Sequence, residues 1–241
     1  MPPPALTDQR IVIVGGSSGI GLAVAECAVA EGARVVIGSS SRANVEAAVA
    51  RLGQAASGGE VDTKEEDSVA AFFANVGTFD HLVYTAGDWG RVLAAKPLAE
   101  MDFEDAAKGM TVRFWGALKA VKHAKDQISP NGSITLTDGV LAHRPQKGAP
   151  LATAFGGAVE HLTRGLAADL APIRVNAVCP GLVMTERMAK ASPQWVQKMT
   201  ERLPLPRAAE PAEVAQAYLY LMRGGYTTGQ VIIVDGGAML I

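Results

Sequence analysis

Hydrophobic and polar positions along the chain follow two alternating periods. Short runs rich in β-branched residues are separated by alanine-rich segments in which apolar residues recur with a helical period. This alternation is typical of a parallel sheet wrapped by helices. It predicts strands at residues 10–15, 33–38, 59–62, 79–87, 132–138, 173–179 and 230–236. We therefore expect one α/β domain over residues 1–241, a doubly wound parallel seven-stranded sheet with helices on both faces.

Two segments interrupt the alternation. They are residues 54–59, "QAASGG", and residues 183–211, which contain several prolines, and neither is a linker long enough to separate domains. The second segment is too long for a plain loop, so we expect it to carry short helices and to cover a substrate. The proline-rich start of the chain is expected to be a frayed tail.

Composition limits the partners. The 241 residues are 49% hydrophobic and 19% charged, and the formal net charge is −2. These values argue against disorder and against an electrostatic grip on nucleic acid, and favour a small-molecule partner. No apolar run is long enough to span a bilayer, and the start has no signal-peptide pattern, so we expect no membrane partner and a cytoplasmic protein.

Cysteines and histidines give no metal pattern. Cys27 and Cys179 are too few for a disulfide framework and lie in apolar segments, so we expect both to be buried as small hydrophobic residues. His81, His123 and His161 share no ligand spacing. The sequence therefore predicts no metal site.

The strongest local signal is "IVIVGGSSGIGLAVAECAVAEGARVVIGSSSR" at residues 11–42. A strand runs into Gly15, Gly19 and Gly21 open a helix, and a second strand follows. Glycines in this context allow a tight turn, close approach of backbone to a diphosphate, and close packing of helix on strand. The N-terminus of the helix also favours the anion.

The spacing Gly15-x3-Gly19-x-Gly21 resembles the short-chain dehydrogenase/reductase family. Four further segments match the family in order, at residues 61–63, 84–87, 173–185 and 228–238, so that the resemblance covers nearly the whole chain. It implies a single-domain Rossmann fold, hydride transfer with a nicotinamide cofactor, and oligomers. The cofactor contacts that it implies are Gly15, Ser17, Ser18, Gly19, Ile20, Gly21, Asp62, Thr63, Ala86, Gly87, Pro180, Gly181, Val183 and Thr185.

The end of the second predicted strand indicates which cofactor is used. An acidic side chain there would bind the ribose 2′-hydroxyl of NAD, but the chain has Ser39, Ser40, Ser41 and Arg42. Hydroxyls and a guanidinium suit a 2′-phosphate, so we expect NADP(H) in preference to NAD(H). The alternative is that Ser41 only caps the next helix and that Arg42 is solvated.

The usual catalytic residues of the family are absent. The resemblance places Gly139 where the family has Ser, Ala152 where it has Tyr, Gly156 where it has Lys, and Arg113 where it has Asn. No Tyr-x-x-x-Lys occurs anywhere in the chain, so a shifted alignment does not recover the motif. Because Gly139, Ala152 and Gly156 are smaller than the residues they replace, we expect a space in the pocket that the longer Arg113 side chain fills.

Three residues are the catalytic candidates in this remodelled pocket. They are Arg113, Asp138 as its partner, and His143, which lies in the loop that borders substrate in the family and would transfer protons. The alternatives are that Arg113 and Asp138 are solvated, that Asp138 points to the other side of the sheet, or that His143 is a surface residue. Asp88 and Trp89 are expected to flank the pocket mouth.

Two functions remain open from the sequence. The first is an NADP(H)-dependent oxidoreductase acting on a small activated carbonyl, quinone or imine. The second is a catalytically inactive NADP(H)-binding sensor or scaffold. We expect a homotetramer or homodimer. The helices predicted within 101–124 and 151–170 carry apolar and small residues over much of their circumference, and the C-terminus is apolar as well.

Overall fold

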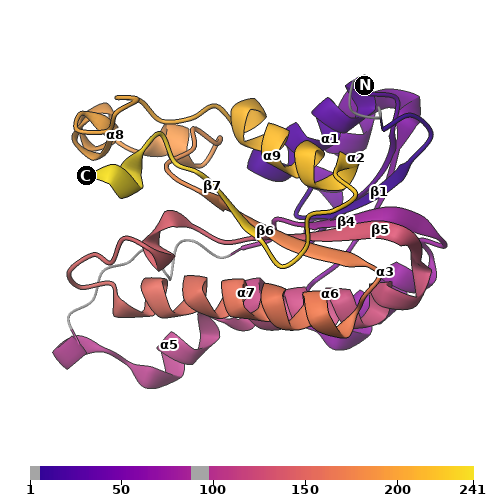
Figure 1. The fold of residues 1–241 in the computed structure, drawn as a ribbon, viewed down its shortest axis with the longest axis horizontal. Helices are drawn as coiled ribbons and strands as arrows, with labels where there is room; N and C mark the ends of the chain where they lie inside the picture. Colours follow the sequence, from indigo (N-terminus) through magenta and orange to yellow (C-terminus); the bar gives the residue numbers. More distant parts are fainter. Residues whose placement is uncertain (1–5, 88–97) are drawn as a thin grey trace.

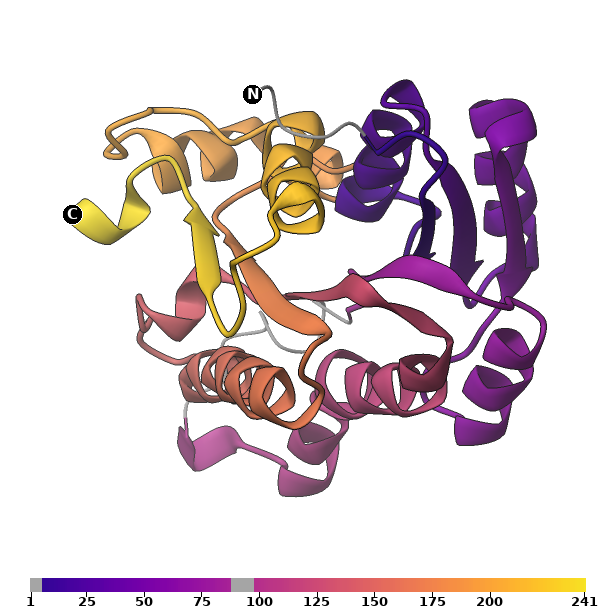
Figure 2. The same cartoon turned by 45° about the vertical axis from the view of Figure 1, so that its right-hand side comes forward.

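The computed structural model, which describes residues 6–87 and 98–241, is a seven-stranded parallel sheet covered by helices on both faces (Figures 1 and 2). The strand order is β3-β2-β1-β4-β5-β6-β7. The strands are β1 (Arg10–Val14), β2 (Arg34–Ser39), β3 (Ala56–Glu60), β4 (Phe79–Tyr84), β5 (Ile128–Thr137), β6 (Arg174–Pro180) and β7 (Val231–Val234). The predicted fold class is confirmed.

Helices cover the two faces of the sheet in two groups. One face carries α1 (Gly19–Ala30), α2 (Arg42–Leu52) and α9 (Pro211–Arg223), and the other carries α3 (Glu66–Ala74), α6 (Ala117–Ala124) and α7 (Pro150–Asp169). Successive side chains of a strand point to opposite faces. Ile11 and Ile13 of β1 accordingly join the first hydrophobic core, and Val12 and Val14 join the second. Burial on both faces explains the continuous apolar runs.

The third strand lies three residues earlier than predicted. Residues 54–59 interrupt the predicted alternation, and the strand was expected at 59–62, yet Ala56–Glu60 pairs with β2 as the edge strand of the sheet. Edge strands need little apolar surface, so the hydrophobic pattern gave no signal. A Cβ atom added at Gly58 would lie 2.6 Å from the Ile37 carbonyl oxygen and 2.6 Å from Val45 Cγ1. Close packing of α2 on the strand therefore requires glycine at this position.

Residues 183–211 contain short helices, as predicted. A 3₁₀ turn spans Met188–Lys190 and α8 spans Pro193–Thr200. Pro193 takes the first helical position, where its missing N–H costs nothing, and the Ser192 hydroxyl accepts a hydrogen bond from the Trp195 N–H at 3.1 Å.

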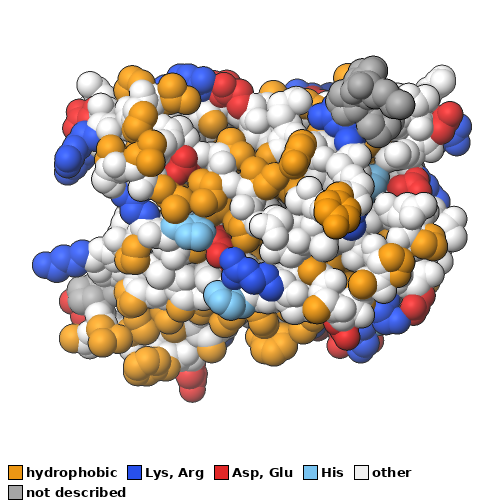
Figure 3. Space-filling model, in the orientation of Figure 1, with side chains coloured by type: hydrophobic (Ala, Val, Ile, Leu, Met, Phe, Trp, Pro, Cys, Tyr) orange, Lys and Arg blue, Asp and Glu red, His pale blue; other side chains and the backbone are white. Residues whose placement is uncertain are grey.

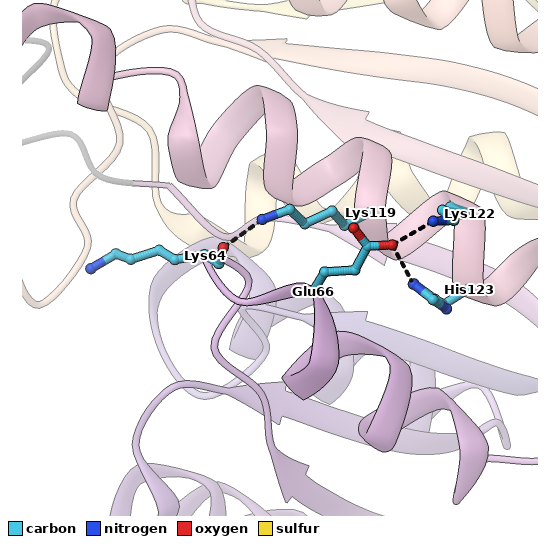
Figure 4. Close-up of polar contacts among 5 residues, drawn as sticks. All are labelled: Lys64, Glu66, Lys119, Lys122 and His123. Atoms are coloured by element: carbon cyan, nitrogen blue, oxygen red, sulfur yellow. Dashed lines mark hydrogen bonds and ion pairs between the residues drawn. The ribbon is translucent and has the colours of Figure 1, made fainter.

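Polar contacts join α3 to α6 on the solvent side (Figure 4). Lys122 Nζ donates to Glu66 Oε1 at 2.5 Å, and His123 Nε2 contacts the same oxygen at 3.2 Å. Lys119 Nζ donates to the Lys64 carbonyl oxygen at 2.5 Å. Exposed pairs of this kind add little to stability, so their main effect is to orient α6. That helix continues from a π-helical turn, Thr111–Gly116, which carries Arg113.

No helix within the described residues combines the length and the apolar character that crossing a bilayer requires. A short helix, α5 (Phe103–Lys108), lies outside the layer formed by α6 and α7 (Figure 1).

Candidate functional site

The carboxyl ends of the parallel strands meet at one edge of the sheet, and the predicted cofactor residues lie there. The connection after β1 leads to α1 on one face and the connection after β4 leads to α6 on the other, so the winding of the chain reverses between these two neighbouring strands, which is where open α/β sheets bind their ligands. Gly15 has φ +89°, and a Cβ atom on it would lie 2.5 Å from the Ala86 amide nitrogen. The glycine loop therefore packs on the backbone that follows β4.

The N-terminus of α1 already holds an anionic group. Glu186 Oε2 accepts a hydrogen bond from the Gly19 amide N–H at 3.0 Å. Glu186 lies in the segment after β6, and Thr185 beside it approaches the same loop, since its Cγ2 lies 3.0 Å from a Cβ placed on Gly19. A carboxylate bound at this helix end shows that the loop offers N–H groups to an anion. The geometry therefore fits a diphosphate.

Ser39 lies at the end of β2 beside the glycine loop. Ser17 Oγ donates to Ser39 Oγ at 2.9 Å, which places both hydroxyls together. Ser40 is exposed on the same turn. Ser41 caps α2 by accepting from the Asn44 N–H at 3.3 Å, and Arg42 is exposed and paired with Glu46 at 3.2 Å. The capping alternative for Ser41 and the solvated alternative for Arg42 are thus both observed.

The other predicted cofactor residues lie along the same edge. Asp62 Oδ1 accepts from the Lys64 N–H at 3.0 Å in the turn after β3. Thr63 is buried against Tyr84 and Gly116. The remainder follow β1, β4 and β6, and comprise Ser18, Ile20, Gly21, Gly87, Pro180, Gly181 and Val183. Whether each contacts a cofactor stays a prediction.

Asp138 follows β5 and points at α7. The residue is fully buried, and a Cβ added at Gly156 would lie 2.7 Å from Asp138 Oδ1 and 2.7 Å from Ala142 Cβ. The alternative that Asp138 faces the other side of the sheet is therefore wrong. The close approach that Gly156 predicted is confirmed, but its nearest neighbours are Asp138 and Ala142 rather than Arg113. Nothing lies within 4 Å of a Cβ at Gly157, so close approach does not explain that glycine.

Glu160 completes the site and was not predicted from the sequence. Ala152, Gly156 and Glu160 are four residues apart on α7, so they share one face of the helix, and all three are buried. Glu160 Oε1 contacts His143 Nε2, and Glu160 Oε2 lies 3.7 Å from Arg164 Nη2. The sequence signal that could have indicated it is an acidic residue one helical turn after Gly156.

Asp138 and Glu160 form a buried pair of carboxyl groups. Desolvation by burial and, second, a hydrogen bond with Glu160 raise the pKa of Asp138 to about 7, against the opposing effect of the positive charge of Arg113. Neither carboxyl oxygen of Asp138 has a hydrogen-bond donor among the described residues when both acids are ionised. A proton placed between the two carboxyl groups supplies that donor. Asp138 therefore keeps its proton below pH 7 and is about half protonated at pH 7.

Arg113 acts on Asp138, and His143 contacts Glu160. Arg113 is buried, close enough for its charge to act on Asp138, Tyr84 and Tyr218. The alternative that Arg113 is solvated is therefore wrong. His143 follows a 3₁₀ turn, Val140–Ala142, and is partly exposed. Asp88 and Trp89 lie outside the described residues.

The cysteines and the remaining histidines have ordinary surroundings. Cys179 of β6 is fully buried, as predicted, and burial together with Asp138 raises the pKa of its thiol, whereas Cys27 is only half-buried. His81 is a core residue bonded to Ser133 Oγ at 2.8 Å and Gln9 Oε1 at 2.7 Å, and burial lowers its pKa to about 4. His161 contacts the Gly157 carbonyl.

Asp138, His143, Glu160 and Cys179 nevertheless bring their polar atoms within 4.8 Å of one another. The sequence gave no hint of this group, because its members come from different elements. The predicted absence of a metal stays a prediction.

Comparisons with known proteins agree with this geometry. A family model described as enoyl-(acyl carrier protein) reductase matches residues 14–239. A short-chain dehydrogenase/reductase of Stachybotrys chlorohalonatus, ATR9, is 35% identical over 255 residues, covering 98% of this chain and 99% of the relative. The chain belongs to the short-chain dehydrogenase/reductase family. This is a family of oxidoreductases, and the resemblance inferred from the glycine loop is confirmed.

Two solved structures of relatives share the fold over almost their full length. A small-chain dehydrogenase in complex with NADPH has a TM-score of 0.83 and 34% identity, with 97% of this chain and 100% of that chain covered. The MalC reductase/Diels-Alderase of Malbranchea aurantiaca has a TM-score of 0.89 and 30% identity, with 98% of both chains covered.

Proposed function

We propose that this short-chain dehydrogenase/reductase is an NADP(H)-dependent enzyme that reduces a small activated carbonyl, quinone or imine, with Asp138 as its proton donor. The observation that carries the proposal is the buried Asp138 carboxyl group. It stands beside Gly139, where the family has its Ser, and faces Gly156, where the family has its Lys. Its pKa of about 7 suits general acid catalysis at neutral pH.

Support for the cofactor comes from the glycine loop and the end of β2. The Gly19 N–H that now binds Glu186 would bind the diphosphate, and the Ser17–Ser39 hydroxyl pair lies where a 2′-phosphate would sit. Arg42 has an exposed side chain at the start of α2, so it could exchange its ion pair with Glu46 for a contact with that phosphate. A relative with 34% identity is known in complex with NADPH. When bound, the cofactor supplies a hydride.

Asp138 and Arg113 would divide the remaining chemistry. Reduction of a C=O or C=N bond requires one proton on the heteroatom for each hydride that reaches carbon. Asp138 would donate that proton, and the buried Arg113 would stabilise the negative charge that develops on the heteroatom. Activated acceptors fit this site because they need less acid assistance than an ordinary ketone. The segment 183–211, with α8, would cover the substrate.

A sensor or scaffold is the second candidate, and Ala152 and Gly156 are the observations that favour it. Neither carries an acid or base where the family has Tyr and Lys.

NADPH oxidation with a panel of diketones, quinones and cyclic imines separates the two functions. We expect turnover with at least one class, a loss of about 10²-fold or more in kcat for Asp138→Asn, and retained NADPH binding. The control is Asp126→Asn, a remote, exposed carboxylate paired with Lys125. NADPH binding without turnover across the panel would favour the sensor.

The proposed enzyme is a homodimer or homotetramer. Phe103 of α5 is 73% exposed and Trp115 is 52% exposed, and the C-terminal Met239, Leu240 and Ile241 are exposed as well. Apolar side chains gather along the lower edge of the molecule in Figure 3, over α5 and α7. Exposed apolar surface of this kind is typical of subunit contacts. Light scattering at micromolar concentration should report a dimer or tetramer, and a monomer would contradict this.

A further inference from the structure

We propose that Glu160 and His143 form a proton relay that connects the buried Asp138 to solvent. The proposal rests on the proposed function, because it explains how Asp138 would be recharged between turnovers. Neither Glu160 nor His143 would touch the reacting atoms, so both act through Asp138 as positioning residues.

Asp138 needs such a path because it is fully buried. A carboxyl group that gives one proton to each product must regain one before the next turnover. Water does not reach the side chain directly, since the exposed fraction of Asp138 is 0%. One oxygen of Asp138 lies within 4.8 Å of a carboxyl oxygen of Glu160, so the nearest proton source is the second carboxyl group.

Glu160 links the interior to the loop that follows β5. Its side chain is 6% exposed, its Oε1 contacts His143 Nε2, and one of its carboxyl oxygens lies within 4.8 Å of an oxygen of Asp138. Its position is fixed by α7, four residues after Gly156, and the absence of a side chain at Gly156 lets the β5 end and the helix approach each other. A carboxyl group close to two titratable partners can pass a proton from one to the other.

His143 is the outer end of the relay. Its side chain is 28% exposed, so the imidazole reaches solvent while Nε2 contacts Glu160. An imidazole accepts a proton at one ring nitrogen and releases one at the other at neutral pH. For each turnover one proton passes from solvent to His143, from His143 to Glu160, and from Glu160 to Asp138, which replaces the proton given to the product.

The other groups around the pair do not provide a second route. Burial raises the pKa values of the Cys179 thiol and the Tyr218 phenol well above neutral, so both stay protonated. Arg113 acts on Asp138 only as a fixed positive charge, and the same holds for Arg164, 3.7 Å from Glu160. Among the described residues, the path from Asp138 to solvent through titratable groups therefore runs by Glu160 and His143.

The test compares His143→Ala, Glu160→Gln and a matched control, His161→Ala. His161 lies on the exposed side of α7 and contacts only the Gly157 carbonyl. We expect His143→Ala to lower kcat about tenfold or more, to leave the affinity for NADPH unchanged, and to change the pH profile of kcat. Added imidazole should restore kcat in a concentration-dependent way, because the truncated side chain leaves an opening to solvent. His161→Ala should match the wild type.

Glu160→Gln should lower kcat without rescue by imidazole, because an amide keeps the shape but carries no transferable proton. If this buried substitution prevents folding, the exposed His143→Ala variant still decides the question. The relay is overturned if His143→Ala keeps the kcat and pH profile of the wild type, or if imidazole restores nothing.

Two further results are distinguishable. If Asp138→Asn is inactive while His143→Ala is unaffected, the relay fails and the proposed function stands. If Asp138→Asn keeps full activity, both fail.

A second control tests for a metal ion. Because the four groups Asp138, His143, Glu160 and Cys179 also lie within 4.8 Å of one another, the enzyme is dialysed against EDTA. Loss of activity that Zn²⁺ restores would mean that a metal bridges the carboxyl groups, and would overturn the relay. Unchanged activity after EDTA supports it.

Discussion

Replacing Asp138 with Asn removes a buried carboxyl group while keeping its shape, and the effect on stability should depend on pH. The pKa of Asp138 is about 7 in the folded protein, against an ordinary value of 3.8. Between these values the folded state binds more protons than the unfolded state, so folding stability falls as pH rises from about 4 to about 7. Above pH 7 the cost of the buried charge is fully present.

The magnitude follows from the two pKa values. They differ by about three pH units, and each unit corresponds to about 1.4 kcal/mol. The Asp138–Glu160 pair therefore costs up to about 4 kcal/mol at pH 8 relative to pH 4, and the amide of Asn abolishes most of that cost while still donating to Glu160. We expect the stability of Asp138→Asn, relative to the wild type, to improve by a few kcal/mol across this range.

Urea unfolding followed by circular dichroism, at a series of pH values and one protein concentration, measures this difference. Asp126→Asn is the control, because the Asp126 side chain is 84% exposed and should give no pH-dependent difference. If the stabilities of Asp138→Asn and the wild type differ by the same amount at every pH, Asp138 titrates at its ordinary value. The neutral-acid assignment would then be refuted.

Three further substitutions test the cofactor site and the remodelled helix. Ser39→Asp should weaken NADPH binding and favour NADH in fluorescence titrations, because a carboxylate repels a 2′-phosphate; unchanged preference contradicts the 2′-phosphate site. Glu186→Gln should tighten NADPH binding about two- to fivefold, because it removes an anion that competes at the α1 N-terminus, and unchanged or weaker binding contradicts this. Gly156→Lys should lower the free energy of unfolding by about 1–3 kcal/mol, because its Cβ would lie 2.7 Å from Asp138 Oδ1. Gly157→Ala is the control and should not destabilise the protein, because nothing lies within 4 Å of a Cβ at that position. Equal stabilities of the two variants would contradict this packing.

The fold was predictable because its signals are local. A buried parallel strand such as β1 contains a continuous apolar run, and Gly15 and Gly21 mark the turn into α1. The edge strand β3 was misplaced because an exposed strand needs no apolar pattern.

The site was predictable only where one segment carries it. The small residues on α7 predicted that another group approaches Gly156 closely, but that group is Asp138 and not the expected Arg113. Glu160 was not predicted as a site residue because its role depends on contacts with His143 and Asp138, which belong to a different part of the chain. Contacts between side chains of distant segments leave no periodic pattern in a sequence.

The most direct test of the central claim is a single-turnover measurement with NADPH bound in advance to the wild type, Asp138→Asn and Arg113→Ala. The loss of nicotinamide absorbance after addition of an activated imine, quinone or diketone reports hydride transfer without product release. The account predicts rapid oxidation of NADPH by the wild type and a loss of about 10²-fold or more in each variant, with NADPH binding retained. Equal rates in all three proteins, or no oxidation of bound NADPH by any acceptor, would contradict it.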